Sequence, residues 1–508
     1  MKLVSLVGAG PGDPGLLTLR GRERLTNCDC LIYDYLVNPE IVALAPPAAI
    51  RHFVGKRGGK ASASQEDINR LLVAAGQAHQ RVVRLKGGDP FLFGRGGEEA
   101  VALAEAGLAF EIIPGVTSGI GAPAYAGIPV THRAASSAVV MVTGHQQHRP
   151  DEPEPPFAWH TIAQVETIVL YMGMHRLAEN CAALVAAGRG ADTPAAIIQW
   201  GTYPHQRVVT GTLADLAAVA KAAGLGAPAI TVIGEVVRFR EHIRWFDHPE
   251  RHPLFGKRIL VTRAREQASE LTEGLRAHGA AVIEMPLARF AWPDDCSALD
   301  SALTHLADFT WLAVTSANAV EFTWQRLRQL GKDARALAHL RIAAVGPATA
   351  RALEAHGLHA DLIPAIADSA HLVAELLAAT SPTSILIPQA DNARTLLRER
   401  LNAAGWTVTT PTAYGAQPLA PTIQLDDHTF DAVTFASSAT VERFVSYAGI
   451  ERVQQWIAAG CRLYAIGPQT AATITALGLP VAAVADGASV AGLVDAVVRD
   501  FGTGQALT

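Results

Sequence analysis

Three glycine-rich loops in the first half of the chain hold the residues best suited to surround a small ligand. They are GAGPGDPG at residues 8–15, RLKGGDPFLFGRGGEE at residues 84–99 and PGVTSGIGAPAYAGIPVTHR at residues 114–133. Glycine has no Cβ, so its backbone can approach a ligand closely. Ordinary surface turns do not need so many small residues, and we therefore expect the three loops to form the walls of one large pocket.

The first loop departs from the dinucleotide-binding fingerprint G-x-G-x-x-G. Gly8 and Gly10 fit that pattern, but Asp13 stands where the third glycine would be. An acid beside a pyrophosphate would repel it, and Pro11 and Pro14 stiffen the turn. The loop alone is compatible with an ordinary strand-to-helix turn. As a ligand site, it favours a ligand without phosphate that carries positive charge.

Short β-rich runs alternate with alanine-rich helical stretches over residues 1–245. Most of the runs end at Gly or Asp just before a helical stretch, which predicts an α/β fold. Ligands bind at the carboxyl ends of the strands in such sheets, where the glycine loops are expected to lie. The expected strands are LVSLVG, CLIYD, RVVRLKGG, FEIIPG, SAVVMVTG, TIVLYMG, AAIIQWG and AITVIGEV.

The second half contains an internal repeat and follows a polar, proline-bearing junction at residues 248–258. VTSANAVEF (314–322) resembles FASSATVERF (435–444), and VGPATARALEAHGL (345–358) resembles IGPQTAATITALGL (466–479) at the same offset. A repeat of this length is a whole lobe rather than a solenoid unit. The sequence therefore predicts two similar α/β lobes with a ligand cleft between them.

Composition narrows the function classes. The chain has 508 residues, a formal net charge of −5 and 18% charged residues, which indicates a globular protein of several domains rather than a general nucleic-acid or membrane-surface binder. No apolar run reaches the roughly 18 residues of a transmembrane helix, and no secretory signal is evident, so we expect a cytoplasmic protein. Five cysteines are scattered, and His145 and His148 form an isolated H-x-x-H, so we expect no metal site.

The glycine loops, taken with VLYMG and IIQWGT, resemble uroporphyrinogen-III C-methyltransferases of the tetrapyrrole methylase family. The resemblance covers nearly all of residues 1–245, in order. It implies a methylase fold of two subdomains, a homodimer formed through this half, and S-adenosylmethionine, a sulfonium without phosphate, as the cofactor. QWGT at residues 199–202 departs from the more usual ENGT type, and Leu92 stands where an isoleucine is frequent.

The resemblance also implies roles for single residues. Asp34 in LIYDYLV matches the family's proposed proton acceptor, and Lys56 in FVGKRGG matches its proton donor. A carboxylate can take the proton that a methylated pyrrole ring must lose. Both residues also have a structural alternative: Asp34 could be an acid that caps a helix, and Lys56 could be a solvated charge in a loop. The implied cofactor contacts are Pro11, Gly87, Gly88, Asp89, Leu92, Thr117, Ser118, Met172 and Gly201.

The substrate implied by this resemblance is an octacarboxylate. Arginines suit carboxylate binding because the guanidinium group pairs with both carboxylate oxygens. Arg57, Arg95 and Arg133 lie in loops where they would line the substrate pocket. Alternatively, these three arginines are ordinary charged residues on the surface.

The second half resembles uroporphyrinogen-III synthase over about residues 256–500. The similarity rests on the short motifs VTRA, TSANAV, VGPATA, ASSATVERF and IGPQTA. That family has two α/β lobes joined by a two-stranded connector. The resemblance implies a linker at residues 246–256 and a synthase domain at 257–505, in which lobe 1 covers about 257–290 and 417–505 and lobe 2 about 291–416.

Hydroxyl groups at helix N-termini in these motifs can bind substrate carboxylates, or they can be plain helix caps. Tyr414 in PTAYGAQP aligns with a tyrosine implicated in the synthase family, where it would assist the loss of hydroxide. Its alternative is a packing or connector tyrosine. The candidate substrate contacts are Thr262, Ser316, Asn318, Ser437, Ser438, Thr440 and Thr470.

Together these resemblances predict a bifunctional enzyme of tetrapyrrole synthesis. The second half would close hydroxymethylbilane to uroporphyrinogen III with inversion of the last ring. The first half would methylate that product at carbons 2 and 7 to give precorrin-2, a precursor of sirohaem and cobalamin. Two alternatives remain: the first half could act on a later corrin precursor, and the second could be a non-catalytic tetrapyrrole-binding module.

Overall fold

The structure is a computed structural model that describes residues 2–55, 64–144, 158–263, 265–393, 395–420, 425 and 429–503. Its first sheet is wholly parallel, in the order β3-β2-β4-β1-β5. The strands are β1 (Leu3–Gly8), β2 (Cys30–Tyr33), β3 (Ile50–Phe53), β4 (Arg81–Lys86) and β5 (Phe110–Ile113), and the helices are α1 (Leu19–Thr26), α2 (Pro39–Val42), α3 (Gln65–Ala78), α4 (Gly96–Glu105) and α5 (Ser118–Tyr125).

Helices cover both faces of this sheet. Side chains alternate along a strand, so Leu6 and Val7 of β1 enter different cores. Leu6 packs with Leu72 of α3 and Leu103 of α4, whereas Val7 packs with core residues of α1 and α2. Burial on both faces explains why β1 and β2 are almost continuously apolar. The carboxyl ends of the strands remain free to carry loops.

A second sheet of mixed direction follows, in the order β6-β7-β10-β8-β9. Only β6 and β7 are parallel in it, and the other pairs are antiparallel. Its strands are β6 (Val139–Thr143), β7 (Thr167–Tyr171), β8 (Pro194–Gln199), β9 (Arg207–Thr212) and β10 (Ala229–Ile233), and its helices are α6 (Trp159–Ile162), α7 (Leu177–Ala186), α8 (Leu216–Ala222) and α9 (Arg240–Ile243).

All eight strands expected from the sequence are present in these two sheets. The sequence reasoning missed β3 and β9, which lie at the edges of their sheets. Edge strands keep exposed and polar residues. Ile50 and Phe53 of β3 are indeed exposed, so their segment lacks the buried apolar run that marks a central strand.

The second half consists of two α/β lobes. Lobe 1 has the parallel sheet β12-β11-β20-β21-β22 and lobe 2 the parallel sheet β15-β14-β16-β18. Lobe 1 is built from β11 (Arg258–Val261), β12 (Ala281–Glu284), β20 (Ala432–Phe435), β21 (Arg462–Ala465), β22 (Ala483–Val484), α10 (Arg265–Ala277), α16 (Ser438–Ala448), α17 (Ile450–Ala458), α18 (Pro468–Ala476) and α19 (Val490–Thr503). Lobe 2 is built from β14 (Trp311–Val314), β15 (Arg341–Ala344), β16 (Ser384–Leu386), β18 (Thr407–Thr409), α11 (Ser297–Thr304), α12 (Ala317–Gln329), α13 (Pro347–Glu354), α14 (Ser369–Ala379) and α15 (Leu396–Ala403).

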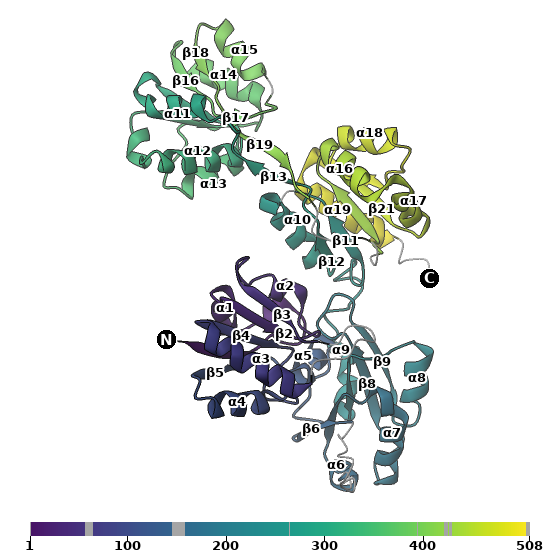
Figure 1. Cartoon of the computed structure of the whole chain (residues 1–508). Helices are drawn as coiled ribbons and strands as arrows, with labels where there is room; N and C mark the ends of the chain where they lie inside the picture. The colour runs from purple at the N-terminus through teal and green to yellow at the C-terminus, as the bar shows by residue number, and fades with distance from the viewer. Residues whose placement is uncertain are drawn as a thin grey trace.

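Two antiparallel strands cross between the lobes (Figure 1). They are β13 (Ala288–Ala291) and β19 (Thr412–Pro418), paired from Ala288 and Pro418 to Ala291 and Gly415. A short strand, β17 (Gln389–Ala390), extends this ladder on the lobe 2 side. The two-lobed α/β architecture with a two-stranded connector is therefore confirmed for the second half.

The backbone confirms the internal repeat. Ser316 at the start of α12 has φ −163° and ψ 157°, and Ser437 at the start of α16 has φ −165° and ψ 158°. Gly346 and Gly467, which begin α13 and α18, agree to within about 10° in φ and are each followed by a proline at the first helical position. The repeated motifs thus encode the same strand-to-helix turn in each lobe.

Among the described residues, contacts to the first half come from the end of the linker and from lobe 1. The backbone N–H of Gly256 donates to the carbonyl of Pro204 at 2.9 Å, and Arg276 of α10 forms an ion pair of 2.9 Å with Glu40 of α2. No helix among the described residues is long and apolar enough to cross a bilayer.

Candidate active site

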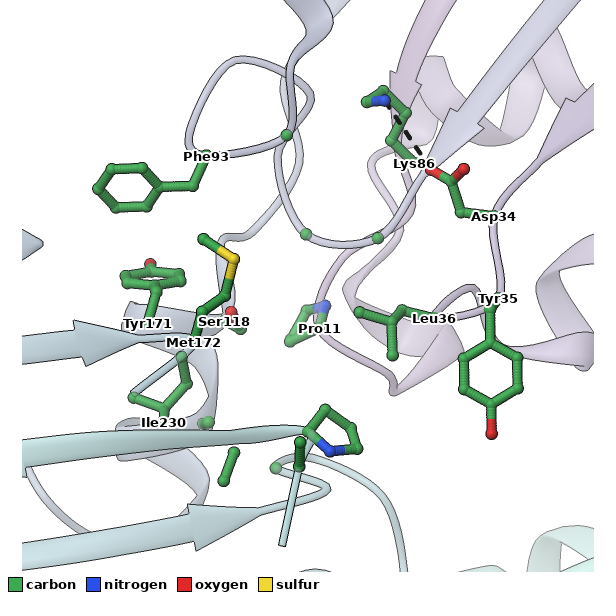
Figure 2. A pocket seen from close by; sticks show the side chains of 18 of the residues that line it. Pro11, Asp34, Tyr35, Leu36, Lys86, Phe93, Ser118, Tyr171, Met172 and Ile230 are labelled. Carbon is green, nitrogen blue, oxygen red and sulfur yellow. Dashed lines mark ion pairs between the residues drawn. The ribbon is translucent and has the colours of Figure 1, made fainter. Parts of the chain in front are cut away.

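A pocket of about 1070 Å³ opens between the first two sheets (Figure 2). Its walls come from the segments that follow β1, β2, β4 and β7, from α5, and from the ends of β8 and β10. It therefore lies where the loops leave the carboxyl ends of the first sheet, which is the common ligand position in α/β folds.

The three glycine loops meet at their backbones, as the sequence predicted. The N–H of Gly10 donates to the carbonyl of Gly88 at 3.2 Å, and the N–H of Gly88 donates to the carbonyl of Gly10 at 2.8 Å. A Cβ on Gly115, in the third loop, would lie only 2.3 Å from the Gly88 oxygen. Glycine is required there because the backbones touch, and the close approach brings all three loops to one pocket.

Two acids of these loops stabilise the loops themselves. Asp13 accepts hydrogen bonds from the Gly15 N–H and the Tyr125 hydroxyl, both at 2.7 Å. Asp89 accepts from the N–H groups of Phe91, Leu92 and Gly115 at 2.8–3.1 Å. Neither acid is among the residues that line the pocket. Asp13 and Asp89 therefore act on the conformation of the loops and do not themselves form the pocket wall.

Most of the candidate residues of the first half are on the pocket wall: Pro11, Asp34, Gly87, Gly88, Arg95, Ser118, Met172 and Gly201. Four others do not line the pocket: Asp89, Leu92, Thr117 and Arg133. Leu92 packs into the apolar core behind it, the Thr117 hydroxyl lies 2.7 Å from the Tyr171 hydroxyl, and Arg133 is exposed. Lys56 and Arg57, like His145 and His148, lie outside the described residues.

The sequence reasoning missed a cluster of buried charge on the pocket wall. Arg84 and Lys86 of β4 line the pocket, and both contact the fully buried Glu99 of α4. Arg84 Nη2 lies 2.8 Å from Asp34 Oδ1, and Lys86 Nζ lies 3.8 Å from Asp34 Oδ2. The signal was available in RVVRLK, because cations at alternate positions of a buried strand share one face.

Burial and neighbouring charge act differently on the two cations. Burial lowers the pKa of Lys86, and repulsion from Arg84 lowers it further. Burial also acts to lower the pKa of Arg84, but Asp34 and Glu99 outweigh this, so that pKa is raised. The guanidinium group therefore remains charged, while the ammonium group is the more easily deprotonated of the two.

The opposite wall is apolar and strained. Phe93 and Tyr171 are in ring contact at 4.9 Å, and Met172 and Ile230 lie beside them (Figure 2). Phe93, Arg95, Met172 and Trp200 all have positive φ, between 50° and 60°. Such conformations are costly for residues with a Cβ and gather at functional sites. Trp200, in the unusual QWGT segment, also lines the pocket.

In the second half, Ser316 and Tyr414 come together within lobe 2. The Ser316 hydroxyl accepts the Ala319 N–H as the cap of α12, and its oxygen lies 3.0 Å from the Tyr414 hydroxyl. The Tyr414 ring is buried and stacks on Phe322 at 5.5 Å. Asn318, two residues into α12, is partly buried. Tyr414 thus has both a packing role and a hydroxyl at the strand ends of lobe 2.

The lobe 1 candidates are mainly engaged in local contacts. Ser437 and Thr440 form a reciprocal capping box at the start of α16, and the Ser438 hydroxyl contacts the Gln469 carbonyl at 3.3 Å. The buried Thr262 hydroxyl donates to the Thr434 carbonyl at 2.9 Å. Thr470, in the first turn of α18, is also buried. Helix capping therefore accounts for the hydrogen bonds of the Ser437 and Thr440 hydroxyls.

A pocket that combines glycine backbone, apolar walls and a buried acid–base cluster defines a small-molecule enzyme, to which a second, two-lobed α/β unit is fused. The profile of a family described as tetrapyrrole (corrin/porphyrin) methylases matches residues 3–217, and that of uroporphyrinogen-III synthase HemD matches residues 269–495. The chain belongs to the tetrapyrrole methylases through its first half and to the uroporphyrinogen-III synthases through its second. It is a bifunctional tetrapyrrole enzyme.

Individual relatives match different shares of the chain. A porphyrin biosynthesis protein HemD from Ruminiclostridium josui is 40% identical over 73% of this chain and 72% of its own length. A uroporphyrinogen-III C-methyltransferase from Synechocystis is 49% identical over 48% of this chain and 92% of its own length. The chain spans only about half the length of siroheme synthase 2 from Aeromonas hydrophila, which is 51% identical over the shared part.

Proposed function

We propose that the second half converts hydroxymethylbilane to uroporphyrinogen III and that the first half methylates this product at carbons 2 and 7. The observation that carries the methylase assignment is the meeting of the three glycine loops at a pocket that contains Asp34. The synthase assignment rests on family membership and on the paired lobes. Precorrin-2 would be the product, on the way to sirohaem or cobalamin.

The pocket residues fit S-adenosylmethionine. Gly10, Gly87 and Gly88 present backbone groups, and Pro11, Met172 and Ile230 form apolar surface beside them. Such a wall suits an adenosine group and a compact cation without phosphate. When bound, this cofactor supplies a methyl group made electrophilic by its sulfonium. We propose that Asp89, Leu92 and Thr117 act from behind the wall by shaping the loops, and that Gly201 and Ser118 contact the cofactor.

Asp34 is the proposed proton acceptor of the methylase. A pyrrole carbon that takes a methyl group leaves its ring as an iminium, which must lose a proton. Asp34 follows β2 and faces the pocket, and Arg84 holds its Oδ1 at 2.8 Å. The carboxylate is therefore fixed in position to take that proton. Arg95, which also lines the pocket, is the proposed partner of a substrate carboxylate.

The proposed acceptor role predicts a large loss of rate in Asp34→Asn. We expect methyl transfer to fall by about 10²–10⁴-fold, the usual contribution of a general acid or base. Binding of S-adenosylhomocysteine, followed by isothermal titration calorimetry, should remain within a few fold of the wild type. Full methyl transfer by this variant would show that another group accepts the proton.

Tyr414 is the proposed catalytic group of the synthase. Its hydroxyl lies next to the Ser316 hydroxyl, which accepts the Ala319 N–H and is thereby fixed at the start of α12. From this place Tyr414 would assist the departure of hydroxide from the linear tetrapyrrole. The remaining catalysis would come from holding the chain in a shape that favours ring closure, with Thr262, Ser316, Asn318, Ser437, Ser438, Thr440 and Thr470 as proposed substrate contacts.

One assay tests both activities. The full chain is given hydroxymethylbilane with and without S-adenosylmethionine, and the products are identified by chromatography and mass spectrometry. We expect uroporphyrinogen III without the cofactor and its dimethylated derivative with it. Only uroporphyrinogen I without cofactor would contradict the synthase assignment and favour a non-catalytic binding module. Unmethylated uroporphyrinogen III with cofactor would contradict the methylase assignment and favour a later corrin substrate.

We also propose a cytoplasmic homodimer that forms through the methylase half. Ile50 and Phe53 of the edge strand β3 are apolar side chains with 48% and 41% of their surface exposed, as expected of a surface that another subunit covers. Light scattering after size-exclusion chromatography should give twice the mass of the chain. A mass equal to one chain would contradict the dimer.

A further inference from the structure

The charge cluster beside the pocket is unusual for its depth. Arg84 is 1% exposed and Glu99 is 0% exposed. Arg84 is the register partner of Leu6, on the face of the sheet that α3 and α4 cover, and Glu99 belongs to α4. Burying ions is costly, and replacing a buried ion pair with apolar residues is often neutral or even stabilising. Stability alone therefore does not explain why four charges, those of Asp34, Arg84, Lys86 and Glu99, are kept here.

The two carboxylates of the cluster occupy different places. Glu99 Oε1 receives both cations, Arg84 Nε at 3.1 Å and Lys86 Nζ at 2.9 Å, and Glu99 is closed off from the pocket. Its other oxygen, Oε2, has no hydrogen-bond partner among the described residues. Asp34 faces the pocket with 27% of its side chain exposed. Glu99 therefore holds the cations from behind, and Asp34 meets the ligand in front.

The charge balance depends on whether Asp34 carries a proton. Two cations and two carboxylates cancel while Asp34 is ionised, and a proton on Asp34 leaves the cluster with one net positive charge. Without Glu99, the cluster would already be positive before the proton arrives. Without Lys86, the cluster would carry one net negative charge before Asp34 takes a proton and would be neutral afterwards. At these distances and this burial, a unit charge strongly alters proton uptake.

We propose that Glu99 and Lys86 are positioning residues of the methylase: Glu99 holds the Lys86 ammonium beside Asp34, and the pair sets how readily Asp34 takes the substrate proton. The proposal rests on the proposed role of Asp34. Among the described residues, the charged groups that face Asp34 are Arg84 and Lys86 from β4, with Glu99 of α4 behind them. Gln65 of α3, 3.4 Å from Glu99, is uncharged.

Two substitutions of opposite sign test this proposal. Asp34 works as an ionised base, so kcat for methyl transfer falls at low pH as the carboxylate takes a proton. Glu99→Gln leaves excess positive charge and should move this acid limb to lower pH by about half a pH unit or more. Lys86→Met removes a cation and should move it to higher pH by about one pH unit. The substrate carboxylates are the same throughout, so they do not produce opposite shifts.

Glu105→Gln provides the matched control, because Glu105 is an exposed acid at the end of the same helix. Its acid limb should coincide with that of the wild type. Affinity for S-adenosylhomocysteine and the thermal unfolding midpoint show whether each variant remains folded; if Glu99→Gln does not fold, Lys86→Met alone decides by the direction of its shift.

The proposal would be overturned if the acid limb of the kcat–pH profile stayed in place in both variants, or if it moved in the same direction in both. Either result would leave the methylase assignment intact. A wild-type enzyme without methyl transfer would instead remove the proposed function, and this inference with it.

Discussion

In the first half of the chain, Asp34 and Glu99 come from separate elements, and both bond to Arg84 of a third element beside one pocket. In the second half, Ser316 and Ser437 each begin a helix in a different lobe and bond mainly within their own turn. The first arrangement is a preformed site made by distant segments. The second is a repeated local turn whose hydroxyl groups already have partners. Similar-looking strand-to-loop motifs can therefore encode either a site or a helix start.

Among the substitutions that test this contrast between the halves, the largest effect is expected where the first-half loops touch. In Gly115→Ala, the new Cβ would lie 2.3 Å from the Gly88 oxygen and 2.8 Å from the Gly8 Cα. Backbone atoms cannot move aside as a flexible side chain can, so the loops must separate. We expect this steric strain to make the closed arrangement of the loops less favourable by about 1–3 kcal/mol. Because the ligand is expected to bind that arrangement, calorimetry should show roughly a ten- to hundredfold loss of S-adenosylhomocysteine affinity.

Gly97→Ala is the control for this substitution, because a Cβ at Gly97 meets no atom within 4 Å. Its affinity should match that of the wild type. Equal affinities in both variants would mean that the contact between the loops does not form the pocket. The first half would then not differ from the second in having a site made by distant segments.

A smaller effect is expected at the helix starts of the second half. Ser437→Ala removes the side chain that accepts the Thr440 N–H, and should lower the free energy of unfolding of this half by about 1 kcal/mol. Ser437→Thr keeps a capping hydroxyl and should recover most of the loss. Urea unfolding followed by circular dichroism measures both. A synthase rate that falls far more than stability in Ser437→Ala would place this hydroxyl on the substrate instead.

The smallest effect is expected at the contact between the halves. The Arg276–Glu40 ion pair is 41% and 46% exposed, and exposed pairs contribute little because water and salt screen them. Arg276→Ala should therefore change the unfolding free energy by less than about 1 kcal/mol. Both product yields should stay within about twofold of the wild type. A large loss of methyl transfer would show that the synthase half supports the methylase pocket.

The sequence predicted the layers, the repeat and the meeting of the glycine loops, because strand periodicity and glycine density have local causes. It did not predict the partners of the acids. Asp13 and Asp89 look like ligand groups in their motifs, yet both bond to loop N–H groups. Conversely, Glu99 stands in an ordinary helical segment, and only the fold shows that its side chain reaches Arg84 and Lys86 of β4.

The connector between the lobes has a consequence for how this half could be rebuilt. Ala291 and Gly415 are paired neighbours in an antiparallel ladder, so the chain leaves lobe 1 and returns to it at adjacent points. Lobe 2 is thus an inserted domain whose two ends lie side by side, as in tolerated domain insertions. A tight hairpin turn placed between these two strands would close the gap. The lobe could then be removed, or exchanged for that of a relative, without rerouting the sheet beneath it.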